Sequence, residues 1–221
     1  MSIEKLISAE KIAMTLFYEI EKRQLIVPGK TEKELNDEVH ALAFELIGTK
    51  TYWHKRIVRS GKNTLLPYRE NPPNLVVEDD DILFFDFGPV LSKWEADVGR
   101  TYVVGNNPLK LKLKNDVEKC WYDTKNWLQQ KPTSTGTEIF TYVSEYAKSN
   151  GWEFGGEIAG HIIGEFPHER IAPSSCELYI HPSNFNDITS EIRGKRRNWI
   201  LEIHFVDREK EIGGFFEQLL M

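Results

Sequence analysis

The chain has 221 residues, of which 40% are hydrophobic and 28% charged, and its formal net charge at pH 7 is -6. This length accommodates a single domain with a sizeable apolar core. The negative charge argues against a nucleic-acid partner, because a surface that binds nucleic acid normally needs a basic patch. The basic cluster Lys195-Arg196-Arg197 is short, lies close to Glu191, and is interpreted as a solvated loop.

The cysteine content and the apolar runs indicate the compartment. Cys120 and Cys176 show no paired spacing, which favours a reduced compartment over a disulfide framework. No apolar run approaches the ~18 residues of a membrane span. The N-terminal residues lack the basic-then-apolar order of a signal peptide. We therefore expect a cytoplasmic location and no membrane partner.

Helical patterns open the chain. Apolar residues at helical spacing predict an amphipathic helix over the first twenty-odd residues, although Glu10 interrupts the apolar stripe. Pro28 and Gly29 end this segment. Thr31-Glu32-Lys33-Glu34 has the form of a capping box, in which the Thr31 hydroxyl and the Glu34 carboxylate satisfy free backbone amides. A second helix is predicted to follow it.

Two carboxylates then emerge from strand-like sequence. The apolar run from Ile82 to Phe85 predicts a strand that carries Asp86, and a second short strand places Asp97 eleven positions later. A tight connection between these strands would bring both carboxylates together. Burying even one unpaired carboxylate costs several kcal/mol. A positive group is therefore expected between them, either Arg100 or a divalent metal.

The second half of the chain repeats the order of the first. A third helix is predicted after Pro108 and a fourth from Thr137-Glu138 to Asn150-Gly151, and strands follow. Gly29-Lys30-Thr31-Glu32 is similar to Thr135-Gly136-Thr137-Glu138, which hints at an internal duplication. Two further carboxylates, Glu202 and Glu217, lie inside apolar strand-like segments, as Asp86 does.

These residues together are typical of a metal centre. Four carboxylates lie within or at the ends of apolar strands, and Gly160-His161-Ile162-Ile163-Gly164 places a histidine between two glycines. Carboxylates and one imidazole are what two adjacent divalent metals require, because two carboxylates can bridge while the other ligands cap each ion. Such ions would also supply the missing positive charge.

The order of these motifs resembles the pita-bread metallopeptidases, which comprise the methionine aminopeptidases, aminopeptidase P and prolidase. The resemblance is carried by Asp86-Phe87-Gly88, Ala96-Asp97-Val98-Gly99-Arg100-Thr101, Gly160-His161-Ile162-Ile163-Gly164, Phe166-Pro167-His168-Glu169, Leu201-Glu202 and Phe216-Glu217.

The resemblance implies an α+β protein with the pita-bread (creatinase/aminopeptidase) fold. This is a curved antiparallel sheet flanked by helices, with an internal pseudo-twofold duplication. We also expect residues 1–221 to form a single catalytic domain, without the separate N-terminal domain that is typical of aminopeptidase P and prolidase, and we expect that a homodimer can form. In its binuclear site Asp86 would chelate one metal, Asp97 and Glu217 would bridge, and His161 and Glu202 would hold the other. Manganese, cobalt, zinc and iron are the candidate ions.

The activity that the resemblance implies is metal-dependent hydrolysis of a peptide or small amide, by an aminopeptidase or an Xaa-Pro-type dipeptidase. A water bridging the two metals would become hydroxide. Glu202 would receive its proton and pass it to the leaving amine. His168 would hydrogen-bond the substrate carbonyl as negative charge develops, unless it is only a satisfied loop histidine. Arg100 would support the strand and the carboxylates.

The substrate-binding residues depart from the family pattern. Tyr68 stands 18 positions before Asp86, where the family usually has histidine, and Glu157 stands where proline-specific members have another. Phe215 replaces the Arg or Gln that usually lies two residues before the last glutamate. His204, two positions after Glu202, is either a pocket residue or an ordinary strand histidine. We expect Tyr68, His204 and Phe215 to contact the substrate.

These departures leave two alternative functions. One is a creatinase-like hydrolase of non-peptide amides, which Tyr68, Glu157 and Phe215 suggest. The other is a non-catalytic binding module on the same fold, which would have no metal and no activity.

Overall fold

A computed structural model describes residues 2–66, 68–168 and 175–220 of the chain. Pro67, and Glu169 of the motif that ends in His168-Glu169, lie outside these residues.

The helices are α1 (Ser2–Lys22), α2 (Glu32–Ile47), α3 (Pro108–Gln129) and α4 (Gly136–Ser149), with short 3-10 helices η1 (Gly61–Leu65) and η2 (Cys176–Leu178). The strands are β1 (Ile57–Ser60), β2 (Asp81–Phe87), β3 (Val90–Leu91), β4 (Trp94–Glu95), β5 (Val98–Val104), β6 (Glu153–Phe154), β7 (Ile162–Ile163), β8 (Glu191–Ile192), β9 (Lys195–Arg196), β10 (Asn198–Asp207) and β11 (Ile212–Leu220).

One antiparallel sheet joins the two halves of the chain. Its strand order is β1-β2-β5-β11-β10-β6, and β7 also pairs with β10. The predicted strands of Asp86 and Asp97 are β2 and β5, which are neighbours, although Asp97 lies just before β5 begins. The connection between them also contains a small hairpin, β3–β4, which the sequence did not reveal.

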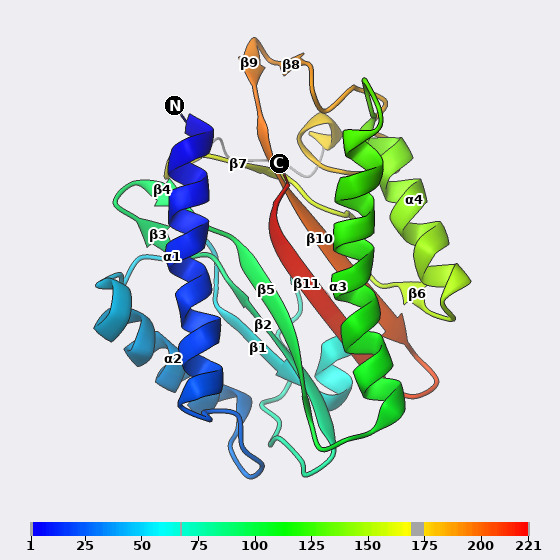
Figure 1. Ribbon diagram of the computed structural model, residues 1–221. Helices are drawn as coiled ribbons and strands as arrows, with labels where there is room; N and C mark the ends of the chain where they lie inside the picture. The colour runs from blue at the N-terminus through cyan, green and yellow to red at the C-terminus, as the bar shows by residue number, and fades with distance from the viewer. Residues whose placement is uncertain (1, 67, 169–174, 221) are drawn as a thin grey trace.

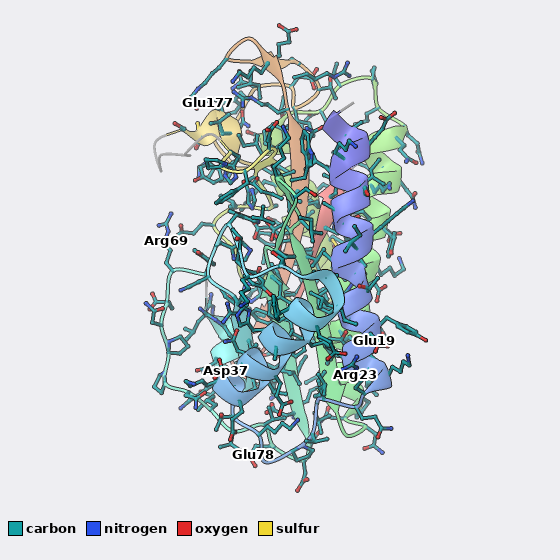
Figure 2. All side chains as sticks on the ribbon, turned by 90° about the vertical axis from the view of Figure 1, so that its left-hand side faces the viewer. Glu19, Arg23, Asp37, Arg69, Glu78 and Glu177 are labelled. Atoms are coloured by element: carbon teal, nitrogen blue, oxygen red, sulfur yellow. The ribbon has the colours of Figure 1, made fainter. Side chains whose placement is uncertain are left out.

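Four helices cover one face of this sheet (Figure 1). Helices α1 and α2 share an apolar core with β1, β2 and β5, whereas α3 and α4 share another with β10 and β11. Each helix pair thus belongs to one half of the sheet, as the predicted duplication requires. In the side view, the labelled Arg69 and Glu177 lie on the side away from α1 (Figure 2). None of the helices in the described ranges has the length and apolar character needed to cross a membrane.

Twin capping boxes begin the second helix of each pair. Thr31 caps α2 together with Glu34, as predicted. In the second half the cap is Thr135 with Glu138 and α4 begins at Gly136, so the predicted start at Thr137 was one residue late. The Thr137 hydroxyl instead donates to the carbonyls of Pro182 and Asn184. A threonine inside the first turn cannot cap it, because the cap must accept from the amide three residues later.

Glu10, which interrupts the apolar stripe of α1, is also explained by the fold. Its Oε2 accepts a hydrogen bond from the backbone amide of Leu219, at 2.5 Å. The carboxylate thus joins α1 to β11, and it satisfies a main-chain donor that the sheet leaves free.

The register of the sheet places the acidic residues in one row. Asp86 lies opposite Gly99, Gly99 opposite Glu217, and Glu217 opposite Glu202. Directly opposed residues of antiparallel strands project to the same face. The carboxylates therefore share one face of the sheet, while the next residues along β2 and β5, Phe85 and Arg100, point toward the helices.

Candidate metal centre

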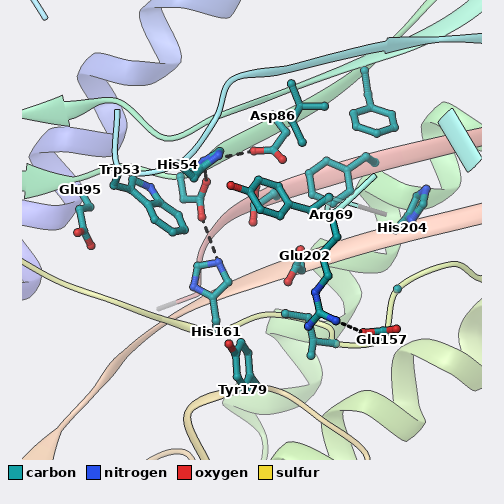
Figure 3. Close-up of a pocket in the computed structure, with 18 of the residues that line it drawn as sticks. Trp53, His54, Arg69, Asp86, Glu95, Glu157, His161, Tyr179, Glu202 and His204 are labelled. Carbon is teal, nitrogen blue, oxygen red and sulfur yellow. Dashed lines mark hydrogen bonds and ion pairs between the residues drawn. The ribbon is translucent and has the colours of Figure 1, made fainter. Parts of the chain in front are cut away.

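The carboxylate row opens into a cavity of about 880 Å³. The cavity is lined by Asp86, Asp97, His161, Glu202 and Glu217. Figure 3 labels Asp86, His161 and Glu202 among them. The structure therefore brings together the five side chains that the sequence analysis identified as candidate ligands, although they are spread over more than half of the chain.

Asp97 occupies the centre of the group. Its side chain is almost fully buried, and each carboxylate oxygen faces an imidazole nitrogen. Oδ1 lies 3.1 Å from His54 Nε2, and Oδ2 lies 3.3 Å from His161 Nε2. Asp86 Oδ1 is 3.5 Å from the same His54 nitrogen.

Two overlapping groups of donor atoms follow from this arrangement. His54, Asp86 and Asp97 form one, and Asp97, His161 and Glu217 form the other, each with ligand atoms within 4.8 Å of one another. Asp97 belongs to both, which is the arrangement expected of a carboxylate that bridges two ions. Glu202 completes the cavity wall from β10, directly opposite Glu217 in the sheet.

His54 was missed by the sequence analysis. It lies in the irregular segment that precedes β1, 43 residues from Asp97. A possible signal was its position three residues before the buried strand that pairs with β2, since Ile57 lies opposite Asp86. That pairing cannot be inferred from the local sequence pattern.

Burial and the neighbouring charges shift the pKa of every carboxyl group in the cluster. Burial raises the pKa of Asp86 to about 6 and that of Glu202 to about 7, and it holds the pKa of Glu217 well above its usual range. Burial acts in the same direction on Asp97, but His54 and His161 outweigh it and lower the pKa of this carboxyl. Two imidazoles are therefore too little positive charge for four buried carboxyl groups.

Charge on the two histidines is favoured by their neighbours. Burial disfavours the charged imidazole, but Asp86 and Asp97 outweigh it at His54 and raise the pKa of this ring to about 9. At His161 the hydrogen bond and charge of Asp97 outweigh burial in the same way, and its pKa also rises to about 9.

The donor set fits divalent cations. Glu202 Oε1 and Glu217 Oε2 are buried and lack a hydrogen-bond partner among the described residues. A buried carboxylate oxygen without a partner is costly, and a cation in contact with it would remove that cost. Carboxylate oxygens with imidazole nitrogens suit manganese, iron, cobalt and zinc.

Arg100 does not lie between the carboxylates. Its Nη1 donates to the carbonyls of Gly99 and Glu217, at 2.7 and 2.9 Å, and its guanidinium stacks on the Phe216 ring. It therefore stabilises the pairing of β5 with β11 from the helix-covered face. Of the two positive groups that the sequence analysis considered, the geometry favours the metal.

His168 is held beside the cluster by a buried carboxylate. Glu95 Oε2 lies 2.7 Å from His168 Nδ1, and Glu95 Oε1 accepts from the His168 amide at 3.1 Å. Glu95 is almost fully buried at the end of β4. Because a carboxylate only accepts hydrogen bonds from such a ring, Nδ1 is the donor and Nε2 is left for a substrate. The sequence analysis did not identify Glu95.

The expected substrate-contacting residues all line the cavity. Phe215 forms an apolar floor with Phe84 and Ile57. Gly99 makes room for this floor, since a Cβ there would lie 2.5 Å from the Phe215 ring. His204 faces the same way as Glu202, but its Nε2 lies 2.8 Å from the Thr64 carbonyl and burial lowers its pKa to about 4.

The mouth of the cavity is more polar. Tyr68 is 47% exposed there, and its hydroxyl accepts a long hydrogen bond of 3.4 Å from the Lys55 amide. Glu157 and Arg69 also line the cavity, and they form a 3.5 Å ion pair with each other (Figure 3).

Comparisons with known proteins identify relatives of this chain. The chain is 28% identical over 171 residues to a protein of Mycoplasma genitalium provisionally named an Xaa-Pro aminopeptidase, an alignment that covers 76% of this chain and 46% of that protein. This chain thus spans about half the length of the curated relative.

Solved structures show the same fold. An Xaa-Pro dipeptidase from Bacillus anthracis matches with a TM-score of 0.75 and 25% identity, covering 98% of this chain and 56% of the dipeptidase. A methionine aminopeptidase from Rickettsia prowazekii matches with a TM-score of 0.71 and 17% identity, covering 98% and 91%. The α+β pita-bread fold that the sequence predicted is therefore confirmed.

The family model for metallopeptidase family M24 matches residues 4–192, which is most of the chain and includes Asp86, Asp97, His161 and His168. The chain therefore belongs to metallopeptidase family M24.

Proposed function

We propose that this protein is a binuclear metal-dependent peptidase that acts on short peptides, as an Xaa-Pro-type dipeptidase or aminopeptidase. The observation that carries the proposal is the row of buried carboxylates across β2, β11 and β10, with Asp97 shared between two donor groups. Membership of family M24 and the names of the Mycoplasma and Bacillus relatives support the same activity.

The predicted ligand roles are part of this proposal. Asp86 would hold one ion, Asp97 and Glu217 would bridge, and His161 and Glu202 would hold the other. The ions would supply positive charge that favours deprotonation of a water and polarises the amide carbonyl. We further propose that residues 1–221 act as one catalytic domain, because both halves of the chain contribute side chains to one cavity. The cytoplasmic location and the homodimer stay predictions from the sequence.

Glu202 and His168 would move and stabilise charge during hydrolysis. Glu202 lines the cavity directly opposite Glu217 in the sheet, where its carboxyl group could accept a proton from a water and return it to the leaving amine. His168, fixed through Nδ1 by Glu95, offers Nε2 to the carbonyl oxygen that becomes negative in the transition state.

The cavity walls favour a small substrate with an apolar side chain. Phe215, Phe84 and Ile57 form an apolar surface directly beside Glu217, on which a proline ring or a similar group can pack. The Arg69–Glu157 pair at the mouth lies where a terminal charge of a dipeptide would enter.

The test is a peptide screen with the purified full chain and added manganese, cobalt, zinc or iron. We expect turnover of Xaa-Pro dipeptides or short Xaa-Pro peptides, and none with Asp97→Ala, which removes the shared carboxylate. Absence of turnover on every peptide of a broad library, with every metal, would contradict the proposal.

A creatinase-like hydrolase is the second candidate. Tyr68 favours it, since a neutral phenol stands where the family pattern places an imidazole near the scissile bond. Turnover of small guanidino or cyclic amides in the same assay, without turnover of peptides, would select this function.

A further inference from the structure

His54 occupies a position at the cavity that the five predicted ligands leave open. Its side chain is only 6% exposed, and its Nε2 faces two carboxylates, Asp97 at 3.1 Å and Asp86 at 3.5 Å (Figure 3). Ligand atoms bound about 2.1 Å from one ion at right angles lie about 3 Å apart. The three atoms are therefore spaced as neighbouring ligands of a single cation are.

The orientation of the His54 ring leaves Nε2 free to bind a metal. Nδ1 lies 2.7 Å from the Lys55 carbonyl, which can only accept, so Nδ1 carries a proton. In a neutral ring Nε2 then has its lone pair directed at the carboxylates. Metal-binding histidines usually donate their other ring nitrogen to a carbonyl or carboxylate in this way.

His161 repeats this arrangement on the other side of Asp97. Its Nδ1 lies 2.8 Å from the Ile162 carbonyl, and its Nε2 faces Asp97 Oδ2 at 3.3 Å. In both histidines the ring nitrogen Nδ1 contacts the carbonyl of the next residue, and Nε2 faces one oxygen of the shared carboxylate. His204, by contrast, directs Nε2 at the Thr64 carbonyl and at no carboxylate.

Neighbouring residues make room for the His54 ring and hold it in place. Gly88 follows β2 directly, and a Cβ at this position would lie 2.2 Å from the Cδ2 atom of His54. The Trp53 indole packs edge-on against His54, with ring centres 4.3 Å apart, and is itself anchored by a 3.0 Å hydrogen bond to the Ala96 carbonyl. The ring is therefore fixed in place beside Asp97.

We infer that His54 is a sixth protein ligand of the metal centre, on the ion that Asp86 holds. This assignment rests on the proposed function, because it concerns the same site. Each ion then has one imidazole nitrogen: His54 beside Asp86 and Asp97, and His161 beside Asp97 and Glu217. A second imidazole shifts the preference of the centre toward zinc, cobalt and iron relative to manganese, which favours oxygen ligands.

The alternative role of His54 is that of a cation. A protonated imidazole in this position would neutralise Asp86 and Asp97 itself, and the chain would then bind only the ion at His161. The two roles differ in the number of ions bound and in the number of imidazoles around them, so that both can be measured without any substrate.

The test combines metal titration with X-ray absorption of the zinc-loaded full-length protein. For the wild type we expect two zinc ions and an average of one imidazole nitrogen per ion, against one for every two ions if His161 alone binds. His54→Phe keeps an aromatic ring against Trp53 but has no nitrogen. The variant is expected to bind one of the two ions with an affinity about 10- to 100-fold lower, or more, and to show half the wild-type number of imidazole nitrogens per ion.

His168→Phe is the matched control. The His168 ring also packs on Trp53, with ring centres 5.1 Å apart, but its Nδ1 faces Glu95 and not the cluster. This variant is expected to keep both ions and the wild-type absorption spectrum. If His54→Phe does not fold, the number of zinc ions bound by the wild type and its imidazole count per ion decide the question together.

The possible failures are distinguishable. Three results would each overturn the assignment and still leave a metal-dependent hydrolase. The first is that His54→Phe binds two ions with unchanged affinity, and the second is that the wild type has one imidazole for every two ions. The third is that the wild type binds a single ion whose affinity does not change in His54→Phe. A wild-type protein that binds no divalent ion would overturn the proposed function together with it.

Discussion

At the scale of single residues, Glu95 and His168 have different roles: Glu95 orients the His168 ring, and His168 would contact the substrate. Glu95 is buried, contacts His168 through both the ring and the backbone amide, and also accepts from the Gly164 amide at 3.2 Å. It touches neither the cavity row of carboxylates nor, in the proposed mechanism, the substrate. It is therefore a positioning residue, which acts by fixing one orientation and one tautomer of His168.

Glu95→Gln tests this role. The substituted amide would place an N–H group against a donor, so that the His168 ring loses its fixed orientation. We expect kcat for the best substrate to fall by about 10²-fold, as for the loss of a group that stabilises transition-state charge, with little change in KM. Steady-state kinetics and metal titration give the answer, and unchanged metal content is part of the expectation. A rise in KM at constant kcat would contradict it.

Some residues of the site could be predicted from the sequence and others could not. The four carboxylates and His161 could be predicted, because a charged residue inside an apolar strand, or a histidine between glycines, is unusual and needs a chemical explanation. His54 and Glu95 have no such local signal. Each acquires its role from a contact with a distant segment, His54 with Asp97 and Glu95 with His168, and such contacts depend on loop paths that no periodicity encodes.

At the scale of elements, the start of α2 fixes the segment that leads to the cavity mouth. Glu32, the first residue of α2, accepts from the Ser60 amide at 2.6 Å and from Asn63 Nδ2 at 3.0 Å. The following Thr64 in turn contacts β10 and β11, through His204 Nε2 and the Gly213 amide. One carboxylate at a helix N-terminus thus connects the helix layer to η1 and, through it, to the cavity side of the sheet.

Glu32→Gln is expected to lower the free energy of unfolding by about 2 kcal/mol, because the amide leaves at least one buried donor without an acceptor. Urea denaturation measures the change. Glu38→Gln is a suitable comparison, since Glu38 lies on the same helix, is partly exposed, and forms an ion pair with Lys30. That variant should cost less than about 1 kcal/mol. Equal losses in the two variants would contradict the role assigned to Glu32.

The elements themselves were largely predictable. Helical periodicity and the capping residues identify α1, α2, α3 and α4, since these signals are local. The β3–β4 hairpin was not predicted because its strands have only two residues each, too few for an alternating pattern. The order of the strands in the sheet was not predicted, because strand pairing is a long-range property that no local signal encodes.

At the scale of the whole molecule, the buried carboxylates oppose folding unless a cation accompanies them. The four carboxyl groups of the metal centre lie beside two imidazoles, those of His54 and His161, and two of the carboxylate oxygens have no partner in the described ranges. Metal binding to the folded chain alone must therefore stabilise it, by about 4 kcal/mol when the free ion is present at a thousand times its dissociation constant.

Saturating zinc or cobalt is accordingly expected to raise the melting temperature of the metal-free protein by roughly 10 °C, given about 2–4 °C per kcal/mol for a chain of this size. Scanning calorimetry of the chelator-treated and reloaded protein measures the shift. Asp97→Ala should show almost none of it. An equal shift in this variant would mean that the ions stabilise the protein at another place.

Because the acidic residues of the metal centre form one row across the sheet, insertions and deletions within the strands have a predictable effect. Asp86, Gly99, Glu217 and Glu202 are one residue each from side chains that point into the helix layer. Inserting or deleting a single residue in β2, β10 or β11 would turn that strand's carboxylate toward the helices and present an apolar side chain to the cavity. Such a shift of strand register would disrupt both the metal centre and the apolar core. An insertion in the turn between β8 and β9 is expected to leave the row intact, because these two strands form a separate sheet.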